Sequence, residues 1–557
     1  MRNFTFSALT FLILSLPTAG RCQLTLNWAR SLAISGASNA HIATDRSGNI
    51  YVAGNSSVPA YNLIKISSAG ALQWSTTGAS GTSNAGSGLI GVGTDNAGNI
   101  YLVSNCATGI YVGAFNTSGG QLWSTTLNYS SRSGSAHAMK VDAAGNVYIG
   151  GQIHVSTTSS LWEYMTIRVS GGVQKYLSVF EGSGNQFSYV TAITSDASGN
   201  AYVTGTSIGA HTYLTRIGRG GEVLIRRDTT FDMTTIKYDS LGNAAWTNTY
   251  NAGINTGDFG FSVAVDNSSG NVYALGQSSL STGLVGDLVA YTSAGAQLWV
   301  NQNTAAPNNN AIAVDPSGNI LTGGVFNFNV SKFNSVGTQA WTYSNSSFNL
   351  QGNQFGGNLT MALDGGGNCY ITSPLTGNTN YFTAQITTSG TLGWSTTYGS
   401  GGQGGSGGIA IYTPVSRIGM ITYPLINVTG TTAANTAFTT LQYTYKPVLS
   451  TAKTVAVTAT DNAGTTTPDH ALTNFPNPFR GNTTISYTLA NDSHVTLQVF
   501  DLAGKPITLL FDGLQNAGPH TQPFNADRLA AGVYFYRIIA TSPKGNSNET
   551  RTMAILP

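Results

Sequence analysis

Aspartate is the residue type whose spacing most suggests chemistry in this chain. Seven aspartates recur at intervals of 50, 47, 54, 70, 49 and 49 residues, and each opens the phrase Asp-x-x-Gly-Asn-x-Tyr or a close variant: Asp45, Asp95, Asp142, Asp196, Asp266, Asp315 and Asp364. Each could bind Ca²⁺ together with turn carbonyls, but Ca²⁺ takes about six to eight oxygens and each phrase supplies one carboxylate. The pattern favours the alternative, a hydrogen bond from the carboxylate to its own turn.

The histidines show no metal-binding pattern. They are His41, His137, His154, His211, His470, His494 and His520, and no two have the spacing of metal ligands such as His-Glu-x-x-His. We therefore assign no catalytic and no cofactor-binding residue from the sequence, with Ca²⁺ as the one cofactor left open. The sequence favours a protein without catalytic activity, although it does not decide the question.

The elements that carry the aspartates form a repeat. Each phrase turns the chain between two apolar runs, because Gly and Asn tolerate the positive φ of a tight reversal. A second phrase, Gly-x-x-x-Trp, follows in most units and ends at Trp74, Trp123, Trp246, Trp299, Trp341 and Trp394, while GVQKY places Tyr176 in the same position. Four short antiparallel strands in about 50 residues make one β-propeller blade. Aromatic residues at such fixed positions are expected to pack between blades.

The phase of the repeat predicts how the ring closes. The chain begins with a Trp-bearing strand, residues 24–29, that has no preceding blade. After Trp394 comes a degenerate copy that lacks such a strand, so the first strand can complete it and leave no exposed sheet edge. We predict an all-β fold, a seven- or eight-bladed β-propeller followed by a small C-terminal β-sandwich, and eight blades are favoured.

The interval of 70 residues after Asp196 predicts an insertion. It contains TRIGRGGEVLI and TTIKYDSLGNAAW, which look like two copies of the third-to-fourth strand hairpin, so an extra hairpin is expected at about residues 216–235. Four arginines lie there: Arg216, Arg219, Arg226 and Arg227. The segment is either a decorated surface loop or an arm for an anionic partner. It joins residues 154–164 and 343–358 as a loop where a ligand could bind.

Composition limits the partners and the location. Only 8% of the 557 residues are charged and the net charge is +2, which argues against nucleic acid. Residues 1–22 read as a signal peptide, with a basic start and an apolar stretch too short to span a bilayer. No other segment predicts a transmembrane span. Cys106 and Cys369 are expected to be buried, apolar and unpaired.

The two parts of the chain resemble known families. Residues 23–447 resemble the propeller repeats of large secreted bacterial proteins. The C-terminal segment 473–557 contains NFPNPF, VTLQVFDLAGKPI and LAAGVYFYRI, and it resembles the type A C-terminal sorting domain of the type IX secretion system of Bacteroidota. The residues that carry this resemblance are Asn474, Pro476, Asn477, Pro478, Phe479, Asp501, Gly504, Gly532 and Tyr534.

The resemblance implies a destination and partners. A sorting domain of this kind is a β-sandwich of about seven strands that binds the secretion machinery. A sortase-like protease usually removes it, and the passenger is released or joined to lipopolysaccharide on the outer surface of the outer membrane. Residues 448–472 are rich in Thr and Ala and read as the linker where the cut would fall. The chain ends in Pro557, whereas members often end in a basic residue.

These observations give two hypotheses of function. The first is a secreted or cell-surface scaffold for binding or adhesion, without catalysis, whose ligand is a surface glycan or a protein. The alternative is a secreted polysaccharide lyase or hydrolase with its site on one propeller face. Carboxylates, His and Arg gathered from several blades at the central channel would favour the enzyme.

Overall fold

The computed structural model describes residues 23–556 and forms two compact units, residues 1–452 and 453–557. Its description omits 35–36, 57–59, 80–87, 130–132, 155–160, 183–186, 218–222, 254–255, 304–308, 326–327, 349, 351–358, 376–379, 400–405, 414–422, 432–436, 447–471, 502–505, 528, 531 and 543–544. The expected signal peptide therefore lies outside the described residues, and so does the expected linker 448–472 up to residue 471. Leu472 is buried in the core of the second unit, so the linker ends one residue earlier than predicted. All of the regular structure that is described consists of strands.

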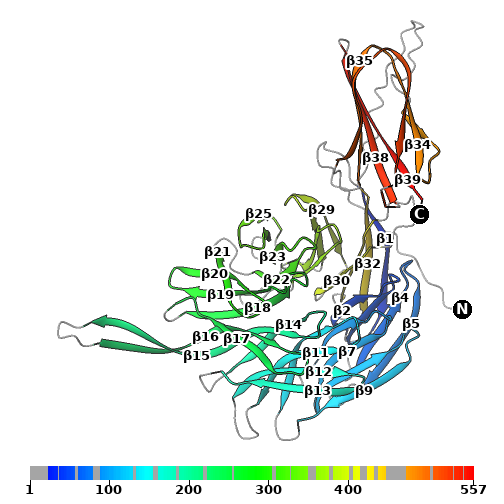
Figure 1. Ribbon diagram of the computed structural model, residues 1–557. Coiled ribbons are helices and arrows are strands. Elements are labelled where there is room, and N and C mark those ends of the chain that lie inside the picture. The colour runs from blue at the N-terminus through cyan, green and yellow to red at the C-terminus, as the bar shows by residue number, and fades with distance from the viewer. Residues whose placement is uncertain are drawn as a thin grey trace, which may run out of the picture. The chain divides into compact units, whose positions relative to one another are not determined.

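The first unit is a ring of eight four-stranded antiparallel sheets, counted over its described residues (Figure 1). Blades 1 to 4 are β2 (Ser38–Thr44), β3 (Ile50–Asn55), β4 (Ala60–Ile66) and β5 (Leu72–Ala79); β6 (Leu89–Thr94), β7 (Ile100–Cys106), β8 (Gly109–Phe115) and β9 (Gln121–Leu127); β10 (Gly134–Val141), β11 (Val147–His154), β12 (Trp162–Ser170) and β13 (Val173–Phe180); and β14 (Tyr189–Ser195), β15 (Ala201–Ile217), β16 (Val223–Tyr238) and β17 (Ala244–Tyr250).

Blades 5 to 8 continue the pattern. They are β18 (Gly257–Val265), β19 (Val272–Leu280), β20 (Gly283–Tyr291) and β21 (Gln297–Asn303); β22 (Asn309–Val314), β23 (Ile320–Gly324), β24 (Asn329–Phe333) and β25 (Gln339–Ser344); β26 (Thr360–Leu363), β27 (Cys369–Pro374), β28 (Asn380–Ile386) and β29 (Leu392–Gly399); and β30 (Ser406–Tyr412), β31 (Leu425–Thr431), β32 (Ala437–Lys446) and β1 (Gln23–Ala33). The first strand of the chain is thus the outer strand of the last blade.

The prediction of a propeller closed by its first strand is confirmed. β1 pairs with β32 from Gln23 opposite Lys446 to Ala33 opposite Ala437. The first strand of each blade is innermost and contacts the innermost strands of both neighbours, and β30 of blade 8 contacts β2 of blade 1. The ring therefore has eight blades and no open end.

One kind of contact joins a blade to the next at seven of the eight junctions of the described ring. The Trp28 ring on β1 packs against Gly70 in the third-to-fourth turn of blade 1, where φ is +84° and an added Cβ would lie 2.6 Å from the ring. The indole N–H donates to the Ser68 carbonyl at 3.3 Å. The same ring-on-glycine contact recurs from blade to blade: Trp74–Gly119, Trp123–Gly172, Tyr176–Gly242, Trp246–Gly295, Trp299–Gly337 and Trp341–Gly390. The phrase Gly-x-x-x-Trp thus supplies both halves of an inter-blade contact.

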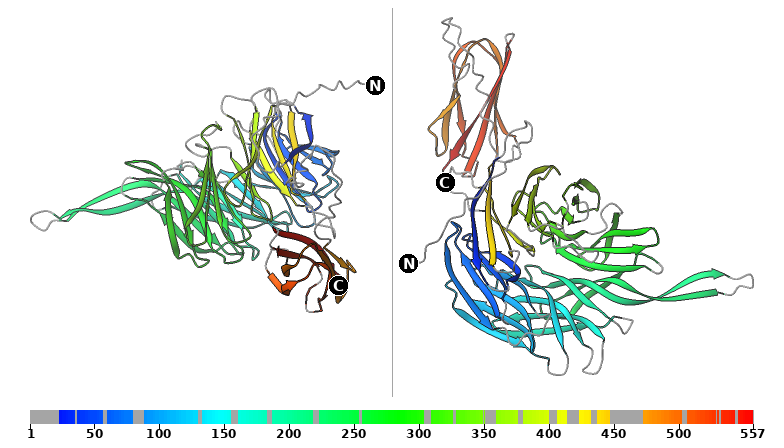
Figure 2. Two further views of the ribbon diagram at one scale, coloured as in Figure 1. Left: turned by 90° about the horizontal axis from the view of Figure 1, so that it is seen from above. Right: turned by 180° about the vertical axis from the view of Figure 1, so that it is seen from behind.

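The prediction of a separate extra hairpin at residues 216–235 of blade 4 was wrong. The second and third strands of that blade are simply longer, and their pairing runs from Ala201 opposite Tyr238 to Ile217 opposite Val223. After Thr206, β15 no longer pairs with β14, and before Met233, β16 does not yet pair with β17, so in this stretch the two strands pair only with each other. We call this two-stranded extension, residues 207–232, the hairpin arm, and it projects from the ring in three views (Figures 1 and 2). The arginines belong to it, with Arg219 outside the described residues.

The second unit is a sandwich of a three-stranded and a four-stranded sheet. The strands are β33 (Thr473–Phe475), β34 (Asn482–Leu489), β35 (Ser493–Phe500), β36 (Pro506–Gln515), β37 (Gly518–Asn525), β38 (Gly532–Ser542) and β39 (Gly545–Ile555), in the orders β33-β34-β37 and β36-β35-β38-β39. Side chains of both sheets alternate into one core that includes Ile485, Leu497 and Ile538. The expected seven-stranded sandwich is confirmed.

We expect Trp28→Ala to destabilise ring closure. Losing the ring against Gly70 and the hydrogen bond to Ser68 should lower the free energy of unfolding by about 3 kcal/mol, in the range for loss of large core side chains. Thermal denaturation and the rate of proteolysis of the mature chain measure this. Leu241→Ala, at a side chain that is 76% exposed, is the control. Equal melting temperatures for Trp28→Ala and the wild type would show that β1 does not hold the ring.

Candidate functional site

The carboxylates of the repeated aspartates accept hydrogen bonds within or next to their own turns. In blade 2, the Asp95 Oδ1 accepts the Asn99 backbone N–H at 2.8 Å, and Oδ2 accepts the Asn99 side-chain amide at 2.8 Å and the Tyr101 hydroxyl at 2.9 Å. Burial and the neighbouring Asp95 charge raise the pKa of Tyr101, so the phenol keeps its proton and donates. The same three contacts occur at Asp45, Asp142, Asp196 and Asp364.

In two repeats the aspartate accepts hydrogen bonds or an ion pair from other donors. In blade 6 the tyrosine is replaced by Leu321, and the Lys332 ammonium lies 2.8 Å from Asp315 instead. The turn of Asp266 is one residue longer, and the hydroxyls of Ser268 and Ser269 donate to its carboxylate. Each substitution restores a donor to a buried carboxylate, as a buried acid requires.

The structure distributes the seven aspartates, one to a blade in blades 1 to 7. Over the described residues, no group of three or more His, Cys, Asp or Glu side chains could hold a metal ion. The geometry therefore supports the turn-stabilising role, and Ca²⁺ binding stays an untested alternative. Cys106 and Cys369 are buried and free of disulfides, and burial raises the pKa of the Cys369 thiol.

The strand directions separate two ends of the ring. All Asp-x-x-Gly-Asn turns and all third-to-fourth turns lie at one end, which we call the turn end. The second-to-third loops and the inter-blade loops lie at the other, which we call the variable end because these loops differ in length from blade to blade. The three loops singled out from the sequence, 154–164, the hairpin arm and 343–358, all emerge at the variable end. Residues 155–160, 218–222, 349 and 351–358 of these loops lie outside the described residues.

The innermost strands carry few groups that could act on a substrate. Over the bounds of the eight strands β2, β6, β10, β14, β18, β22, β26 and β30, the charged residues are Lys140 and Asp258, with His41 and His137 as the histidines. Desolvation lowers the pKa of His41 to about 4, so this imidazole is neutral at pH 7. The remaining positions are Gly, Ala, Ser, Thr, Asn and apolar residues. A wall of this kind supplies neither an acid–base pair nor a cationic clamp.

Sequence reasoning missed a group of buried acids in blades 4 and 5. Asp232, Asp258 and Asp287 are 0%, 0% and 1% exposed. Asp287 accepts hydrogen bonds from the Tyr250 and Ser278 hydroxyls and from the Gln302 amide. No motif surrounds these residues in the sequence, and an isolated Asp is normally taken as exposed. Only the packing of the two blades reveals them.

Asp258 is the least satisfied of the three. Its Oδ2 accepts the Thr256 hydroxyl at 2.9 Å and the Ala252 N–H at 3.2 Å, but its buried Oδ1 has no hydrogen-bond partner. Burial raises the pKa of Asp258 to about 6, and burial also raises the pKa of Asp287. Asp258 therefore holds a proton under mildly acidic conditions. Asp258 and Asp232 both hold the loop between blades 4 and 5 by hydrogen bonds, since Asn251 of this loop donates to Asp232 at 2.9 Å.

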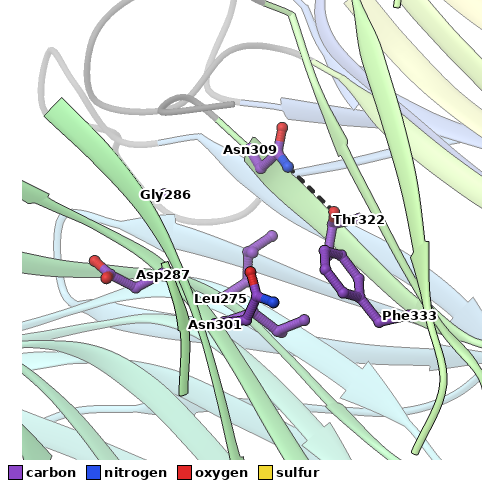
Figure 3. Close-up of a pocket in the computed structure, with 8 residues that line it drawn as sticks. Leu275, Gly286, Asp287, Asn301, Asn309, Thr322 and Phe333 are labelled. Carbon is purple, nitrogen blue, oxygen red and sulfur yellow. Dashed lines mark hydrogen bonds between the residues drawn. The ribbon is translucent and has the colours of Figure 1, made fainter. Parts of the chain in front are cut away.

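A small recess lies between blades 5 and 6, and Asp287 is one of the residues that line it (Figure 3). Leu275, Asn301 and Phe333 line it. In its wall on blade 6, the Asn309 amide donates to the Thr322 hydroxyl at 3.1 Å. It has room for about one water molecule, far less than a pocket for a small organic ligand. The recess is therefore a packing feature and not a ligand pocket.

The residues of the NFPNPF phrase join the two sheets of the second unit. Asn474 on β33 donates to Thr483 at 3.1 Å and accepts the Tyr536 hydroxyl of the other sheet at 3.1 Å. The Asn477 side chain donates to the Thr552 carbonyl at 3.0 Å and accepts the Ala554 N–H at 2.9 Å, which mimics a strand beside β39.

The rest of the phrase and the later motif residues have defined places. Phe479 is 2% exposed in the core and exchanges backbone hydrogen bonds with Ala554 and Leu556. The peptide bonds preceding Pro476 and Pro478 are cis. The Tyr534 hydroxyl donates to the Ala530 carbonyl, Gly532 begins β38, and Asp501 follows β35. Gly504 lies outside the described residues.

Family models match both units. Residues 473–549 match the secretion system C-terminal sorting domain, and residues 28–59 match the beta-propeller repeat. The second unit is a type IX secretion sorting domain. The protein is therefore exported, and such domains often lead to attachment at the outer cell surface. Binding to the type IX secretion machinery follows from the same match. Over the described residues, no helix is long and apolar enough to cross a membrane.

Solved structures resemble the ring only distantly, and no curated protein matches the chain. A virginiamycin B lyase from Staphylococcus aureus is 9% identical, with 63% of this chain and 94% of the lyase covered and a TM-score of 0.37. A streptogramin B lyase is 12% identical, with 75% and 97% covered and a TM-score of 0.36. A protein of unknown function from Bacteroides caccae is 10% identical, with 60% and 90% covered and a TM-score of 0.30. Scores of this size support no inference about activity.

Removing a turn aspartate should cost stability, whereas removing calcium should not. Asp95→Ala leaves the Asn99 and Tyr101 donors without their acceptor and should lower the free energy of unfolding by about 1–3 kcal/mol. The melting temperature of the wild type should be the same in EDTA and in millimolar Ca²⁺. A melting temperature that falls by several degrees in EDTA and recovers with Ca²⁺ would show that the aspartates bind the ion.

Stability should fall as the pH rises through about 6. The pKa of Asp258 is raised by folding, so folding takes up a proton there, and this contribution is full below about pH 4 and lost above the folded value. The loss is at most about 3 kcal/mol. Asp258→Asn places an amide at the unpartnered Oδ1 and should flatten the profile of melting temperature between about pH 4 and 6. An unchanged slope in this variant would assign the pH dependence to other groups.

Proposed function

We propose that the propeller is a non-catalytic binding scaffold, displayed on the cell surface or released from it after type IX export. The ligand binds the loops of the variable end, and its class is a surface glycan or another surface protein. The observation that carries the proposal is the composition of the eight innermost strands, whose charged residues are Lys140 and Asp258, the latter buried. An enzyme acting in the central channel would need acids, bases or electrophilic side chains there.

The repeat positions support the same conclusion. The Asp and Tyr residues of the first phrase are satisfied within their turns, as at Asp95 and Tyr101. The Trp residues of the second phrase pack on the glycines of the next blade. Side chains committed to the ring in this way are not available for a ligand. Recognition is therefore left to the loops, as in other scaffolds with grafted sites.

The alternative is a polysaccharide lyase or hydrolase, and one observation favours it. Asp258 and Asp287 are two carboxylates with raised pKa values in one blade, which is a pattern of acid–base catalysts. Both side chains are closed to solvent, at 0% and 1% exposure, and they accept from neutral donors of blades 4 and 5 and of the loop between them. A general acid must reach the atom that it protonates. Catalysis by these residues would require blades 4 and 5 to open.

Export has its own proposed steps. A sortase-like protease removes the sorting domain by cutting in the linker 448–471, and the propeller is then released or joined to lipopolysaccharide. Two features support this proposal: the match over residues 473–549, and a separation of the two compact units that falls at Ala452.

Deletion of residues 474–557 should leave the protein in the periplasm. The deletion removes the strands that the machinery recognises and leaves β1 to β32, which form the ring, intact. Immunoblots of the periplasmic, outer-membrane and culture fractions measure the outcome, with a periplasmic marker protein as control. Delivery of the truncated protein to the surface would show that the domain is not the export signal.

The proposed function is tested by binding and turnover together. The mature chain, residues 23–557, is screened on a glycan array, and each polysaccharide that binds is analysed for cleavage products. Binding without products supports the scaffold, and a protein ligand found by cross-linking at the cell surface also supports it. Products that disappear in Asp258→Asn would instead establish the enzyme.

A further inference from the structure

Five aromatic side chains gather at the variable end of blades 3 and 4. We call His137, His154, Trp162, Phe187 and Tyr189 the aromatic platform. His154 ends β11 and Trp162 begins β12, while His137 lies on β10 and Tyr189 begins β14. Phe187 precedes β14 in the loop between the two blades. All five are described, and all five lie outside the two repeated phrases.

Ring contacts and one backbone hydrogen bond link the two blades at the platform. The rings of His154 and Trp162 face each other across the strand pair with centroids 3.6 Å apart. The Ser188 N–H donates to the Trp162 carbonyl at 2.9 Å, which fixes Phe187 and Tyr189 beside Trp162. The Tyr189 ring lies 6.1 Å from the His137 ring in an edge contact. The platform therefore bridges two blades at one spot.

The platform is not part of the core. The repeat tryptophans pack on glycines of the neighbouring blade, but Phe187 is 52% exposed. In the described part of the ring, the other large hydrophobic side chains of comparable exposure are aliphatic, and most lie at the turn end: Leu122, Val173, Leu241, Leu298 and Val336. An exposed aromatic group that spans two blades lowers solubility without aiding the fold, which marks a binding surface.

The polar groups that contact the His137 ring are neutral. The His137 Nδ1–H donates to the Val190 carbonyl at 3.0 Å, which leaves Nε2 as the acceptor facing the Ser135 hydroxyl at 3.2 Å. Desolvation lowers the pKa of His137, so its imidazole is uncharged at pH 7. None of the five residues carries a fixed charge. A phosphate or sulfate polymer would find no cation among them.

We infer that the aromatic platform binds a neutral carbohydrate chain. A pyranose presents an apolar C–H face, which stacks on an aromatic ring, and a rim of hydroxyls, which needs neutral donors and acceptors. The platform offers rings at Trp162 and Phe187 and a hydroxyl–imidazole pair at Ser135 and His137. A protein partner would need a larger continuous apolar patch at the centre of its interface. This assignment rests on the proposed function and names its ligand class.

The test compares four variants of the mature chain: Phe187→Ala, Trp162→Ala, Trp162→Phe and, as the control at the turn end, Leu241→Ala. Binding is measured on an array of neutral glycans and by retardation in native gels that contain dextran, laminarin, galactomannan or, as the anionic probe, polygalacturonate. The first two changes should each weaken neutral-glycan binding about five- to tenfold. Trp162→Phe should keep most of it, and Leu241→Ala all of it. Melting temperatures confirm that each variant is folded, and Phe187 is exposed enough for its loss to leave the fold intact.

Other outcomes overturn the inference in distinguishable ways. Neutral-glycan binding that persists in Phe187→Ala and Trp162→Ala places the ligand elsewhere and leaves the scaffold function standing. Retardation by polygalacturonate alone would favour the arginines of the hairpin arm. Capture of a purified surface protein that these two changes abolish, with no glycan bound, would make the platform a protein contact. Turnover of a polysaccharide would overturn the proposed function itself.

Discussion

The ring depends on an aromatic side chain of one blade packed against a turn glycine of the next. A single blade of four short strands cannot bury its faces, so it is stable only against neighbours. The glycine has positive φ, as at Gly70, and any side chain there would strike the ring of Trp28. The same indole donates to a turn carbonyl, so the contact fixes both distance and orientation. Because Trp28 lies on the first strand, this contact also closes the ring.

The repeat architecture could be predicted from the sequence because its contacts are made by residues at fixed positions of each repeat. The turn aspartates, the positive-φ glycines and the tryptophans are local signals that recur with the blade, so their period reveals the number of blades and the closure by residues 24–29. The hairpin arm was misplaced because a longer strand pair has the same apolar pattern as a new hairpin. TRIGRGGEVLI was therefore taken for a third-to-fourth turn, whereas its strands continue the register of Ala201 and Tyr238.

The candidate site was less predictable because burial is a property of the packed ring. Asp258 and Asp287 stand in segments without any motif, and only the packing of the sheets closes them to solvent. Likewise, His137 and Trp162 are 25 positions apart in the sequence and in different strands. The loop at 154–164 was singled out as a place where a ligand could bind, but the partners of its Trp162 come from β10, β11 and β14. No spacing in the sequence encodes such a meeting.

Blades 3 to 5 each depart from the repeat, as do blade 6, where Leu321 replaces the tyrosine, and the degenerate blade 8. Tyr176 replaces tryptophan in blade 3, the hairpin arm extends blade 4, and the turn at Asp266 of blade 5 is longer by one residue. The buried acids and the aromatic platform lie in the same three blades. Local inconsistency with the repeat is expected where a site is built. All eight blades form the closed ring, and the proposed binding features lie on blades 3 to 5 of it.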